Sequence, residues 1–590
     1  MIEKMNELTQ HSRYEGTLFL QPVAGDISGR REAENNAVAG KGAGRDMYAY
    51  APVSGCPHPK QCQVLMVLRN GCDEASAEAV MKKYALDELA EEKNFLLLFP
   101  NPVGEGWNYD NDSARENDMD YLVRCFGVLK GSELGVSGFN GMVFYLADSA
   151  EASAMLMTMA ALKPLNVPAM MISSFPEGYA IPGDALGVET AAFVSGNPEA
   201  VRYLEKANRC SGKGETAEGV SLTYGTNPNV RLLVTDRAVD RDTVRIAWER
   251  LFSETRRWQN DVYGCYQKRT EFTKKGFTAH VKDTSLGCNG GHPQTWYEYI
   301  PPQLRETQEK VPLLFYFHGG GCVPLYGAEQ SDWHEVADRE NFIVVYPEAS
   351  QRNMWNAWDD RENLEFSDMD FFLALIAHMK EVHPIDESRI YVSGFSMGGM
   401  MSNAIACAYP EVIAAAAPCN AFNEGYFSDF KTLTSRVGGQ SYDPASTAAD
   451  IPATPVRQRA DAKKAAFDYR VPVIQTAGLI DGKWPITQAW DARLLTFDYW
   501  KKYNNIHTEP FEQDPNSLSG LKAGLTFYDG EDSRFLHHCW FTSDEGHASL
   551  YELFLAKRCP HALDIRTTGY LWNFLKRFSR NSDGTLNINE

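Results

Sequence analysis

A serine between two glycines is the first candidate for chemistry. Ser396 lies in Gly394-Phe395-Ser396-Met397-Gly398, directly after the strand-like run RIYVS and before the helix-like run MGGMMSNAIACA. This G-x-S-x-G pattern predicts a sharp strand-to-helix turn, in which the glycines let strand and helix approach closely. Such a turn raises the serine clear of the sheet at a helix N-terminus, where the helix dipole stabilises developing negative charge. We therefore expect Ser396 to act as a nucleophile rather than as a structural turn residue.

A second glycine-rich segment, His318-Gly319-Gly320-Gly321, follows the apolar run LLFYF. Attack of a serine on a carbonyl carbon creates an oxyanion, which needs two preorganised N–H donors, each worth roughly 3 kcal/mol of barrier. Glycines allow the backbone to turn its amides toward that oxygen. We assign one donor to Gly320, with Gly321 as the alternative, and the other to Met397, the residue after the nucleophile. His318 is expected to anchor the loop rather than to take part in the reaction.

A serine hydroxyl needs a base, and the base needs a carboxylate that orients it. The expected acid is Asp481, which follows the strand-like run VPVIQTAG, and Asp491 is its alternative. The expected base is His547, in DEGHASLYELFL, at the start of a helix-like segment. His537 and His538 compete with it in the same region. The resulting order of Ser, Asp and His along the chain is that of the α/β-hydrolase fold.

Three tryptophans, Trp355, Trp358 and Trp484, accompany these segments. Aromatic side chains near the site would suit a flat or apolar acyl group, so the three are candidate substrate contacts. They could equally belong to the hydrophobic core, and the sequence alone leaves both roles open.

The two halves of the chain repeat each other. Five segments of the first half recur in the same order in the second half, and the longest match, between the segments that start at Tyr145 and Tyr391, is free of gaps at an offset of 246 residues. Within each copy, short β-branched and aromatic runs alternate with segments of helical spacing, which is typical of a mostly parallel sheet flanked by helices. We therefore predict two tandem α/β-hydrolase-like domains, residues 1–265 and 266–590.

In the second copy the alternation of strands and helices is clear enough to place elements. Chemistry in such sheets gathers at the carboxyl ends of the strands. The insert at about 421–470 interrupts the alternation, and a stretch this long usually covers a site or binds something. Strands are expected at 313–317, 343–346, 390–393, 414–417, 473–477 and 525–528, and helices at 367–382 and 397–409.

The first copy has lost these chemical elements. The alignment puts Ala150 at the position of the nucleophile and LRNG, residues 68–71, at the position of the glycine loop. Asp240 is the candidate for a surviving acid, and no histidine falls where the base is needed. Ser149, one position from Ala150, lacks flanking glycines. We expect a catalytically inactive domain that packs against the active copy or forms one wall of its substrate cleft, with separate ligand binding or assembly as the alternatives.

The second half resembles the polyhydroxybutyrate-depolymerase and feruloyl-esterase group of α/β-hydrolases. The resemblance covers roughly residues 275–580 and is carried by HGGGC, by WNAWDD from Trp355 to Asp360 with the DMD that follows, by GFSMGG, by the strand-then-acid segment and by a terminal Gly-His. It implies hydrolysis of an ester through a covalent acyl-serine, with no metal and no organic cofactor. Ordinary members carry one such domain and often a signal peptide, whereas residues 1–14 here contain no apolar signal-peptide core.

Composition argues against several partners. The 57 basic and 78 acidic side chains give a formal charge of −21, which opposes binding to nucleic acid or to an anionic membrane. The sequence lacks the roughly 18 continuous apolar residues of a membrane span. The 12 cysteines lack the paired spacing of a structural zinc site and favour free thiols in a reducing cytoplasm over disulfides. A cytoplasmic protein that acts on a small or oligomeric ester is expected, and homo-oligomerisation stays open.

Three functional hypotheses compete. The first is a serine carboxylesterase for an acyl or aryl ester of the hydroxycinnamoyl or hydroxyalkanoate type. The second is a serine peptidase with an accessory N-terminal domain, because the same triad hydrolyses amides. The third is a non-enzymatic binding protein. The retention of nucleophile, glycine loop, acid and base in one copy argues against the third hypothesis.

Overall fold

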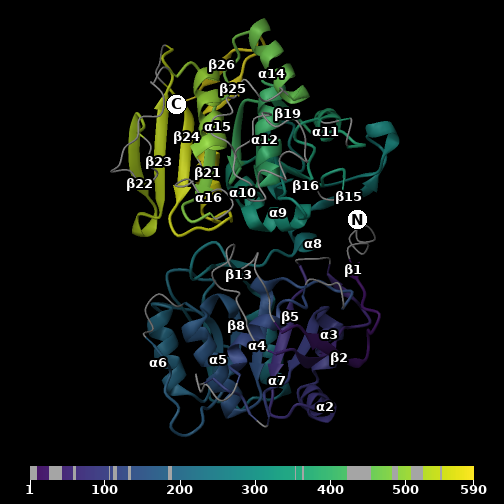
Figure 1. Cartoon of the computed structure of the whole chain (residues 1–590), viewed down its shortest axis with the longest axis vertical. Coiled ribbons are helices and arrows are strands. Elements are labelled where there is room, and N and C mark those ends of the chain that lie inside the picture. Colours follow the sequence, from purple (N-terminus) through teal and green to yellow (C-terminus); the bar gives the residue numbers. More distant parts are fainter. Residues whose placement is uncertain are drawn as a thin grey trace. The chain divides into compact units, whose positions relative to one another are not determined.

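A computed structural model describes the chain in two compact units that meet between Thr270 and Glu271. The boundary predicted from the sequence lies five residues earlier. Figure 1 colours the first unit purple to blue and the second unit teal to yellow. The structure describes residues 9–25, 43–57, 61–104, 106–109, 116–129, 134–183, 189–351, 354–359, 361, 364–421, 454–481, 490–506, 522–544 and 548–589.

The C-terminal unit is built on a ten-stranded sheet. Six neighbouring strands, from β18 to β24 in spatial order, run parallel, and the strands outside them pair antiparallel. The spatial order is β15 (Thr278–Asp283), β16 (Gln294–Tyr299), β18 (Ile343–Pro347), β17 (Val311–Phe317), β19 (Ile385–Phe395), β20 (Ala415–Cys419), β21 (Val473–Gly478), β24 (Ser549–Ala556), β23 (Phe535–Phe541) and β22 (Leu525–Asp529).

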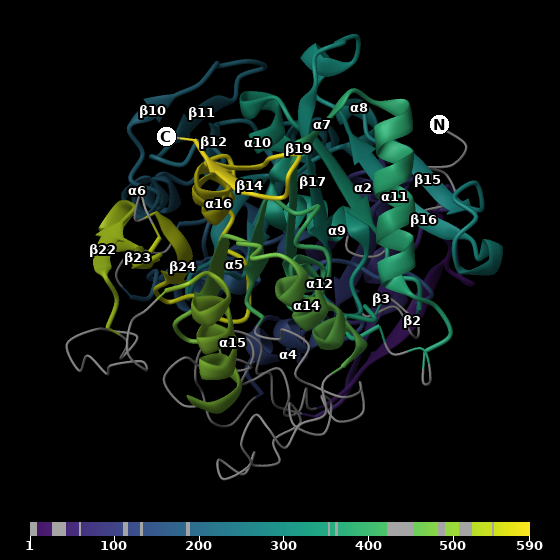
Figure 2. The ribbon, with the colours of Figure 1, turned by 90° about the horizontal axis from the view of Figure 1, so that it is seen from above.

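Helices cover both faces of this sheet, so its central strands are apolar on both sides. In β17, Phe315 and Phe317 pack against Phe372 of α11 on one face, while Tyr391 of β19 meets Trp572 of α16 on the other. The helices of the first face are α11 (Asp368–Val382), α12 (Met397–Ala408), α14 (Pro455–Ala466) and α15 (Trp490–Tyr503), and those of the second are α9 (Pro324–Ser331), α10 (Trp333–Glu340) and α16 (Thr567–Leu575) (Figure 2).

The N-terminal unit contains a second ten-stranded sheet with the same topology. Position by position, each neighbouring pair has the same parallel or antiparallel sense as its counterpart, so β7 corresponds to β19, β9 to β21 and β12 to β24. Its spatial order is β2 (Leu18–Val23), β3 (Arg45–Tyr50), β6 (Leu96–Pro100), β5 (Val64–Leu68), β7 (Val143–Ala147), β8 (Ala169–Ile172), β9 (Ala191–Ser195), β12 (Arg231–Thr235), β11 (Ser221–Tyr224) and β10 (Gly212–Lys213).

The remaining elements are the helices of the N-terminal unit, one short helix and three two-stranded sheets. Six helices of the N-terminal unit are α2 (Glu74–Lys83), α3 (Leu86–Lys93), α4 (Asp118–Cys125), α5 (Ala150–Leu162), α6 (Pro198–Ala207) and α7 (Arg241–Arg250), and α8 (Phe272–Lys275) opens the C-terminal unit. Two-stranded sheets are formed by β1 (Thr9–Gln10) with β4 (Cys56–Pro57), β13 (Thr255–Trp258) with β14 (Cys265–Lys268), and β25 (Phe578–Arg580) with β26 (Leu586–Ile588). None of the helices in the described ranges is long and apolar enough to cross a membrane.

Each unit also contains an equivalent buried hydrogen bond, at corresponding positions, which supports the internal repeat. Asp118, the first residue of α4, accepts the backbone N–H of Asn108 at 2.7 Å. Its counterpart Asp368, the first residue of α11, accepts the backbone N–H of Asn356 at 2.6 Å. Burial raises the pKa of both carboxyl groups. In each unit, an aspartate at the start of the helix therefore holds the loop that precedes the helix.

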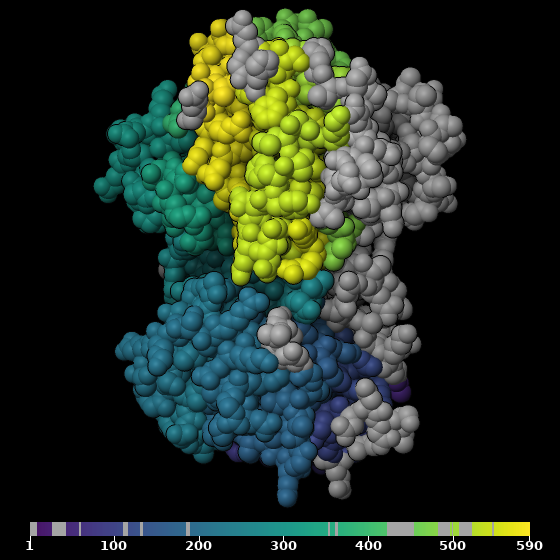
Figure 3. All heavy atoms as spheres, turned by 90° about the vertical axis from the view of Figure 1, so that its left-hand side faces the viewer, coloured from purple at the N-terminus to yellow at the C-terminus, as the bar shows by residue number. Residues whose placement is uncertain are grey.

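The strands and helices predicted for the second copy are present, with ends shifted by a few residues. The prediction was wrong after His547, where a helix-like segment was expected and the structure has strand β24. All eight residues of β24 are buried, so the strand lacks the alternation of apolar and polar residues that would have revealed it. Strand β23, its neighbour, was not predicted. Strand β22 beyond it is an edge, exposed along its whole length, and this yellow-green side of the unit faces the viewer in Figure 3.

Candidate active site

Three polar side chains meet at the carboxyl edge of the C-terminal sheet. Ser396 follows β19, Asp481 follows β21 and His561 follows β24. Because neighbouring parallel strands end at the same edge, these loops lie side by side. The Nε2 atom of His561 is 2.9 Å from Oγ of Ser396, and its Nδ1 atom is 2.8 Å from Oδ2 of Asp481. The imidazole therefore bridges the hydroxyl and the carboxylate within hydrogen-bonding distance of both.

The backbone at Ser396 has the strained conformation that the sequence pattern predicts. Its φ of 55° and ψ of −118° are rare for a residue with a side chain. A Cβ atom at Gly394 would lie 2.4 Å from the carbonyl oxygen of Gly398, and one at Gly398 would lie 1.9 Å from that of Phe317. The N–H of Ser396 donates to the carbonyl of Cys419 on the next strand, at 2.9 Å. Only glycine permits this approach of strand and helix, which holds the serine at the apex.

Asp481 is fully buried and held by more than the imidazole. The side-chain amide of Asn420, directly after β20, donates to the same Oδ2 atom at 3.1 Å. The N–H of Asp481 donates to the carbonyl of Gly478 at 3.2 Å. A buried carboxylate without such partners would be costly. Asn420 was not identified from the sequence, although it follows a predicted strand at the edge where the triad was expected.

The imidazole at the centre of the site belongs to His561, whereas the sequence analysis assigned the base to His547. Strand β24 runs parallel to β21, with Ala556 opposite Gly478, so the carboxyl end of β24 lies near Asp481 and its amino end, at Ser549, lies at the opposite edge of the sheet. The chain reaches the active edge only after β24, where His561 follows. His547 itself lies outside the described residues. Recognition of β24 as a strand would have pointed to His561, the next histidine.

The two competing histidines lie within the sheet. Both belong to β23, the antiparallel neighbour of β24. His537 is stacked on Phe527, and burial lowers its pKa to about 4. His538 is fully buried, with its Nδ1 atom 2.9 Å from Oγ1 of Thr526. Neither side chain is placed at the edge where Ser396 lies.

A buried ion pair fixes the loop that carries His561. Asp564, three residues further on, is 2.9 Å from Nη2 of Arg534 and 2.6 Å from Nη2 of Arg566. Burial alone would raise the pKa of Asp564, but Arg566 and Arg534 outweigh it and hold the pKa below its usual value. The ring of Phe395, beside the nucleophile, packs on the imidazole with the ring centroids 4.9 Å apart. The base is thus positioned from two sides although it lies on a connection.

The glycine loop lies against the start of helix α12. A Cβ atom at Gly320 would be 2.7 Å from the sulfur of Met397, the first residue of that helix. The N–H groups of the first turn of a helix have no acceptor within the helix. The two residues expected to supply oxyanion donors, Gly320 and Met397, are therefore neighbours beside Ser396.

His318 and Trp355 anchor this loop. Nε2 of His318 accepts the N–H of Ala349 at 3.1 Å, and the indole N–H of Trp355 donates to the His318 carbonyl at 2.7 Å. The ring of Trp355 also meets Phe317 edge-on, with the centroids 5.1 Å apart. His318 therefore has the anchoring role expected for it.

Of the two roles left open for the tryptophans, substrate contact and core, the structure favours the core for the two that it describes. Trp355 and Trp358 are 1% and 0% exposed and are members of the main hydrophobic cluster of this unit. Aromatic side chains serve cores and binding sites alike, so the sequence could not distinguish these roles. Trp484 lies outside the described residues.

The insert predicted at 421–470 is described from residue 454 onward. Thr454 caps helix α14 by accepting the N–H of Arg457 at 3.3 Å, and α14 packs against α12. Arg459 of this helix pairs with the buried Asp359 at 3.1 Å. The described part of the insert therefore supports the helix that begins at the nucleophile and the segment that contains Trp355.

The corresponding edge of the N-terminal unit has a different local structure. Ala150, aligned with Ser396, is the first residue of α5. Ser149 is an ordinary N-cap with a φ of −139°, and its hydroxyl oxygen accepts the N–H of Ala152 at 3.1 Å. The same hydroxyl donates to Oδ1 of Asn70 at 2.9 Å. The strained turn is absent here, and Ser149 is engaged in capping.

The acid proposed for this unit was assigned to the wrong strand. Asp240 follows β12, which corresponds to β24, whereas Asp481 follows β21, the counterpart of β9. Asp240 caps α7 by accepting the N–H of Thr243 at 2.8 Å. Histidine is absent between residues 59 and 270, so the loop after β12 cannot supply an imidazole.

Part of the C-terminal half matches a known protein family. Residues 295–448, which include the glycine loop and Ser396, match the family model described as Esterase PHB depolymerase. The C-terminal half therefore resembles this family in the segment that contains the glycine loop and the nucleophile. The matched residues end before Asp481 and His561, so the structure extends the comparison to the other two members of the triad.

Several curated esterases are similar to parts of this chain. A bifunctional acetylxylan esterase/xylanase of Neocallimastix patriciarum is 37% identical over 125 residues, 21% of this chain and 17% of that protein. Feruloyl esterase B of Thermothelomyces thermophilus is 32% identical over 139 residues, which are 23% of this chain and 46% of that protein. Poly(3-hydroxyalkanoate) depolymerase C of Paucimonas lemoignei is 30% identical over 141 residues, which are 23% of this chain and 33% of that protein. The chain spans less than half the length of each relative.

Replacement of Gly398 by alanine should destabilise the C-terminal half. The added methyl would overlap the Phe317 carbonyl oxygen at 1.9 Å, and overpacking of this kind costs about 3 kcal/mol of unfolding free energy. The control is Gly569→Ala in helix α16, where no atom lies within 4 Å of the new Cβ. It should be neutral or stabilising by up to about 1 kcal/mol. Urea unfolding measures both, and a Gly398→Ala variant as stable as the wild type would contradict the strained turn.

Replacement of Trp355 by phenylalanine should lower both stability and ester turnover. It leaves the His318 carbonyl without its indole donor, at a cost of about 1–3 kcal/mol, and loosens the loop that contains Gly320. The matched control is Trp107→Phe, because Trp107 donates in the same way to the Arg69 carbonyl at 3.1 Å in the N-terminal unit. Calorimetry should show similar losses for both variants, with p-nitrophenyl acetate turnover reduced only in Trp355→Phe. Equal turnover in all three proteins would show that the loop does not depend on Trp355.

Proposed function

We propose that the C-terminal half is a serine carboxylesterase in which Ser396 is the nucleophile, His561 the general base and Asp481 the acid that orients the base. The observation that carries the proposal is the His561 imidazole, at 2.9 Å from the hydroxyl and 2.8 Å from the carboxylate. A serine activated in this way at the apex of a strained turn is the arrangement that acyl transfer requires. The match to an esterase family supports the ester as substrate.

The reaction follows from the positions of these atoms. Nε2 of His561 takes the proton of the Ser396 hydroxyl while Oγ bonds to the ester carbonyl carbon, and the oxyanion faces the N–H groups of Gly320 and Met397. The imidazolium then gives its proton to the departing alkoxide. The alcohol leaves, and the acyl group stays bound to Oγ of Ser396 as an acyl-serine. A water molecule, deprotonated by His561, attacks the acyl carbon, and the proton returns to Oγ as the acid departs.

Asp481 and Asn420 act through the imidazole in this scheme. The carboxylate accepts a hydrogen bond from the Nδ1–H group of His561, which keeps the proton on Nδ1 and leaves Nε2 free to act as a base. The Asn420 amide fixes the carboxylate through its bond to Oδ2 at 3.1 Å. Asn420 is accordingly a positioning residue.

The proposed substrate class is an acyl or aryl ester of a modest-sized acid, such as an acetyl, hydroxycinnamoyl or hydroxyalkanoate ester. The similar proteins are named acetylxylan esterase, feruloyl esterase and poly(3-hydroxyalkanoate) depolymerase, and an ester carbonyl is common to these names. Phe395 and Met397, the two neighbours of Ser396 in the chain, are both apolar and largely buried. Apolar surroundings of this kind fit an acyl group better than a charged one.

We also propose that the N-terminal half is a catalytically inactive copy of the same fold with a structural role. It shares strand order and a buried Asp–loop bond with the esterase half. Ala150 and the capping Ser149 replace the strained serine. This proposal places all covalent chemistry of the described chain at Ser396.

A matched pair of histidine variants tests the assignment of the base. His561→Gln should reduce kcat for p-nitrophenyl acetate by about 10⁴-fold or more, because the hydroxyl loses its proton acceptor. His547→Gln, the alternative from the sequence, should retain most of the activity. A large loss in His547→Gln together with an active His561→Gln would reverse the assignment.

Ser396→Ala tests the nucleophile and the inactive copy together. It should abolish ester turnover and all labelling by a fluorophosphonate probe, while circular dichroism and melting stay those of the wild type. Residual labelling would mean that a second nucleophile exists, in the N-terminal half or elsewhere.

A substrate panel separates the esterase from the peptidase hypothesis. p-Nitrophenyl acetate, methyl ferulate, a 3-hydroxybutyrate oligomer and a peptide p-nitroanilide are compared on the intact chain. At least one ester should exceed the anilide in kcat/KM by about 100-fold or more. Comparable hydrolysis of the anilide would favour the peptidase.

A further inference from the structure

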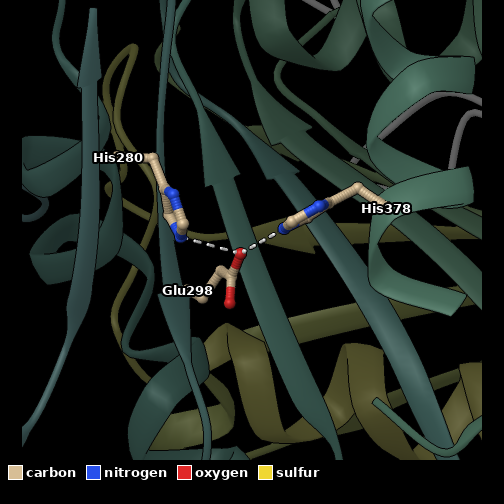
Figure 4. A group of neighbouring side chains, drawn as sticks. All are labelled: His280, Glu298 and His378. Carbon is tan, nitrogen blue, oxygen red and sulfur yellow. Dashed lines mark ion pairs between the residues drawn. The ribbon is translucent and has the colours of Figure 1, made fainter. Parts of the chain in front are cut away.

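Three histidines converge on one carboxylate in the C-terminal unit, at a place the triad does not use. His280 lies on β15, Glu298 on β16 and His378 on α11 (Figure 4). His383 follows the end of α11. Helix α11 begins at Asp368, which accepts the N–H of Ser350 beyond the carboxyl end of β18, and it ends before the amino end of β19. The cluster therefore lies toward the edge of the sheet opposite to Ser396.

The ligand atoms of the cluster are close together. Nε2 of His280 and Nε2 of His378 lie 3.2 Å and 3.5 Å from the same oxygen of Glu298, Oε1. Nε2 of His383 lies 3.3 Å from the other oxygen, Oε2. The side chain of Glu298 is 4% exposed and the three imidazoles are 20–22% exposed. The carboxylate is thus buried beneath imidazoles that solvent can still reach.

These separations fit the coordination shell of a metal ion. Donor atoms held about 2.1 Å from a tetrahedral ion are about 3.4 Å from one another. The two separations that involve Oε1 are 3.2 and 3.5 Å, and the donor atoms of His280, Glu298 and His378 all lie within 4.8 Å of one another. Imidazole nitrogen with a carboxylate oxygen is a ligand set typical of Zn²⁺ and other first-row divalent ions.

The surroundings of the cluster orient its ligands. Nδ1 of His280 faces Oδ2 of Asp283 at 3.4 Å, as in the carboxylate–histidine–metal arrangement that keeps Nε2 free for the ion. The Trp296 indole N–H donates to Oε1 of Glu298 at 2.9 Å. The Trp296 ring is stacked on His280, with the centroids 4.2 Å apart and the planes 3° from parallel. Both the imidazole and the carboxylate are therefore fixed in orientation.

The N-terminal unit shows that the fold does not require this cluster. The sequence match that aligns Trp296 with Met47 puts Ala49 at the position of Glu298. The offset that aligns Asp368 with Asp118 puts Val128 at the position of His378. Two apolar side chains therefore occupy these positions in a sheet of the same topology, and the polar cluster is particular to the esterase half.

We propose that His280, Glu298 and His378 bind one first-row divalent ion such as Zn²⁺, with His383 as a further donor on the other carboxylate oxygen. The ion would link the edge strands β15 and β16 to helix α11. Because it would bind the folded chain and lies away from Ser396, its role is to stabilise this part of the unit rather than to take part in ester hydrolysis.

The test is calorimetric titration of the chelator-treated full chain with ZnCl₂, together with thermal melting. The wild type should bind one Zn²⁺ that His378→Gln and Glu298→Gln bind at least about 100-fold more weakly. Zn²⁺ should raise the melting temperature of the wild type by several degrees and leave that of the two variants unchanged. The control is His292→Gln, because His292 stacks on Phe366 outside the cluster, and it should behave as the wild type.

Three outcomes would overturn the site. The first is a wild type that shows no Zn²⁺ binding. The second is equal binding in wild type, His378→Gln and Glu298→Gln, which would assign the ion to the cysteine thiols that all three proteins share. The third is an equal loss in His292→Gln. Fluorophosphonate labelling of Ser396 is measured in the same samples, so a failure of the metal site is distinguishable from a failure of the esterase proposal.

Discussion

The backbone at Ser396 is the constraint on which the C-terminal half depends. A residue held at a φ of 55° and a ψ of −118° costs about 1–3 kcal/mol and persists only where its surroundings determine it. Here those surroundings are three neighbouring parallel strands, because Gly398 contacts the end of β17 and the N–H of Ser396 bonds to the end of β20. The position of the nucleophile therefore depends on the register of these strands in the sheet.

A comparison of the two halves distinguishes the residues that maintain the fold from those that form the candidate active site. Both contain the same strand order, an aspartate at the start of the helix that holds the preceding loop, and a tryptophan whose indole bonds to the end of the strand. These features maintain packing with or without a catalytic serine. What distinguishes the C-terminal half is a small set of residues at one edge: two glycines beside Ser396, a glycine loop, Asn420 with Asp481, and His561. The N-terminal unit has the same buried frame without these residues.

Local patterns were enough for part of the site and not for the rest. Ser396 and Asp481 each follow a recognisable strand, and the structure places both at the edge of the sheet that the sequence predicted. His561 required knowledge of β24, whose eight buried residues carry no periodic signal. The role of Trp355 stayed open in the sequence because the chemistry of an indole does not reveal which side of a loop it faces. The grouping of His280 with His378 depends on a strand and a helix far apart in the chain, which only the packing of the sheet brings together.

The position of His561 on a connection, rather than on a strand or helix, limits how this chain can vary in length. Surface connections ordinarily accept insertions. The five-residue step from Ala556 to His561 has no such freedom, because the strand end beside Gly478 and the buried Asp564 fix it at both sides. An added residue here would swing the imidazole out of line without disturbing the core. We therefore expect changes of length to be tolerated best in connections that contain neither a triad residue nor the glycine loop.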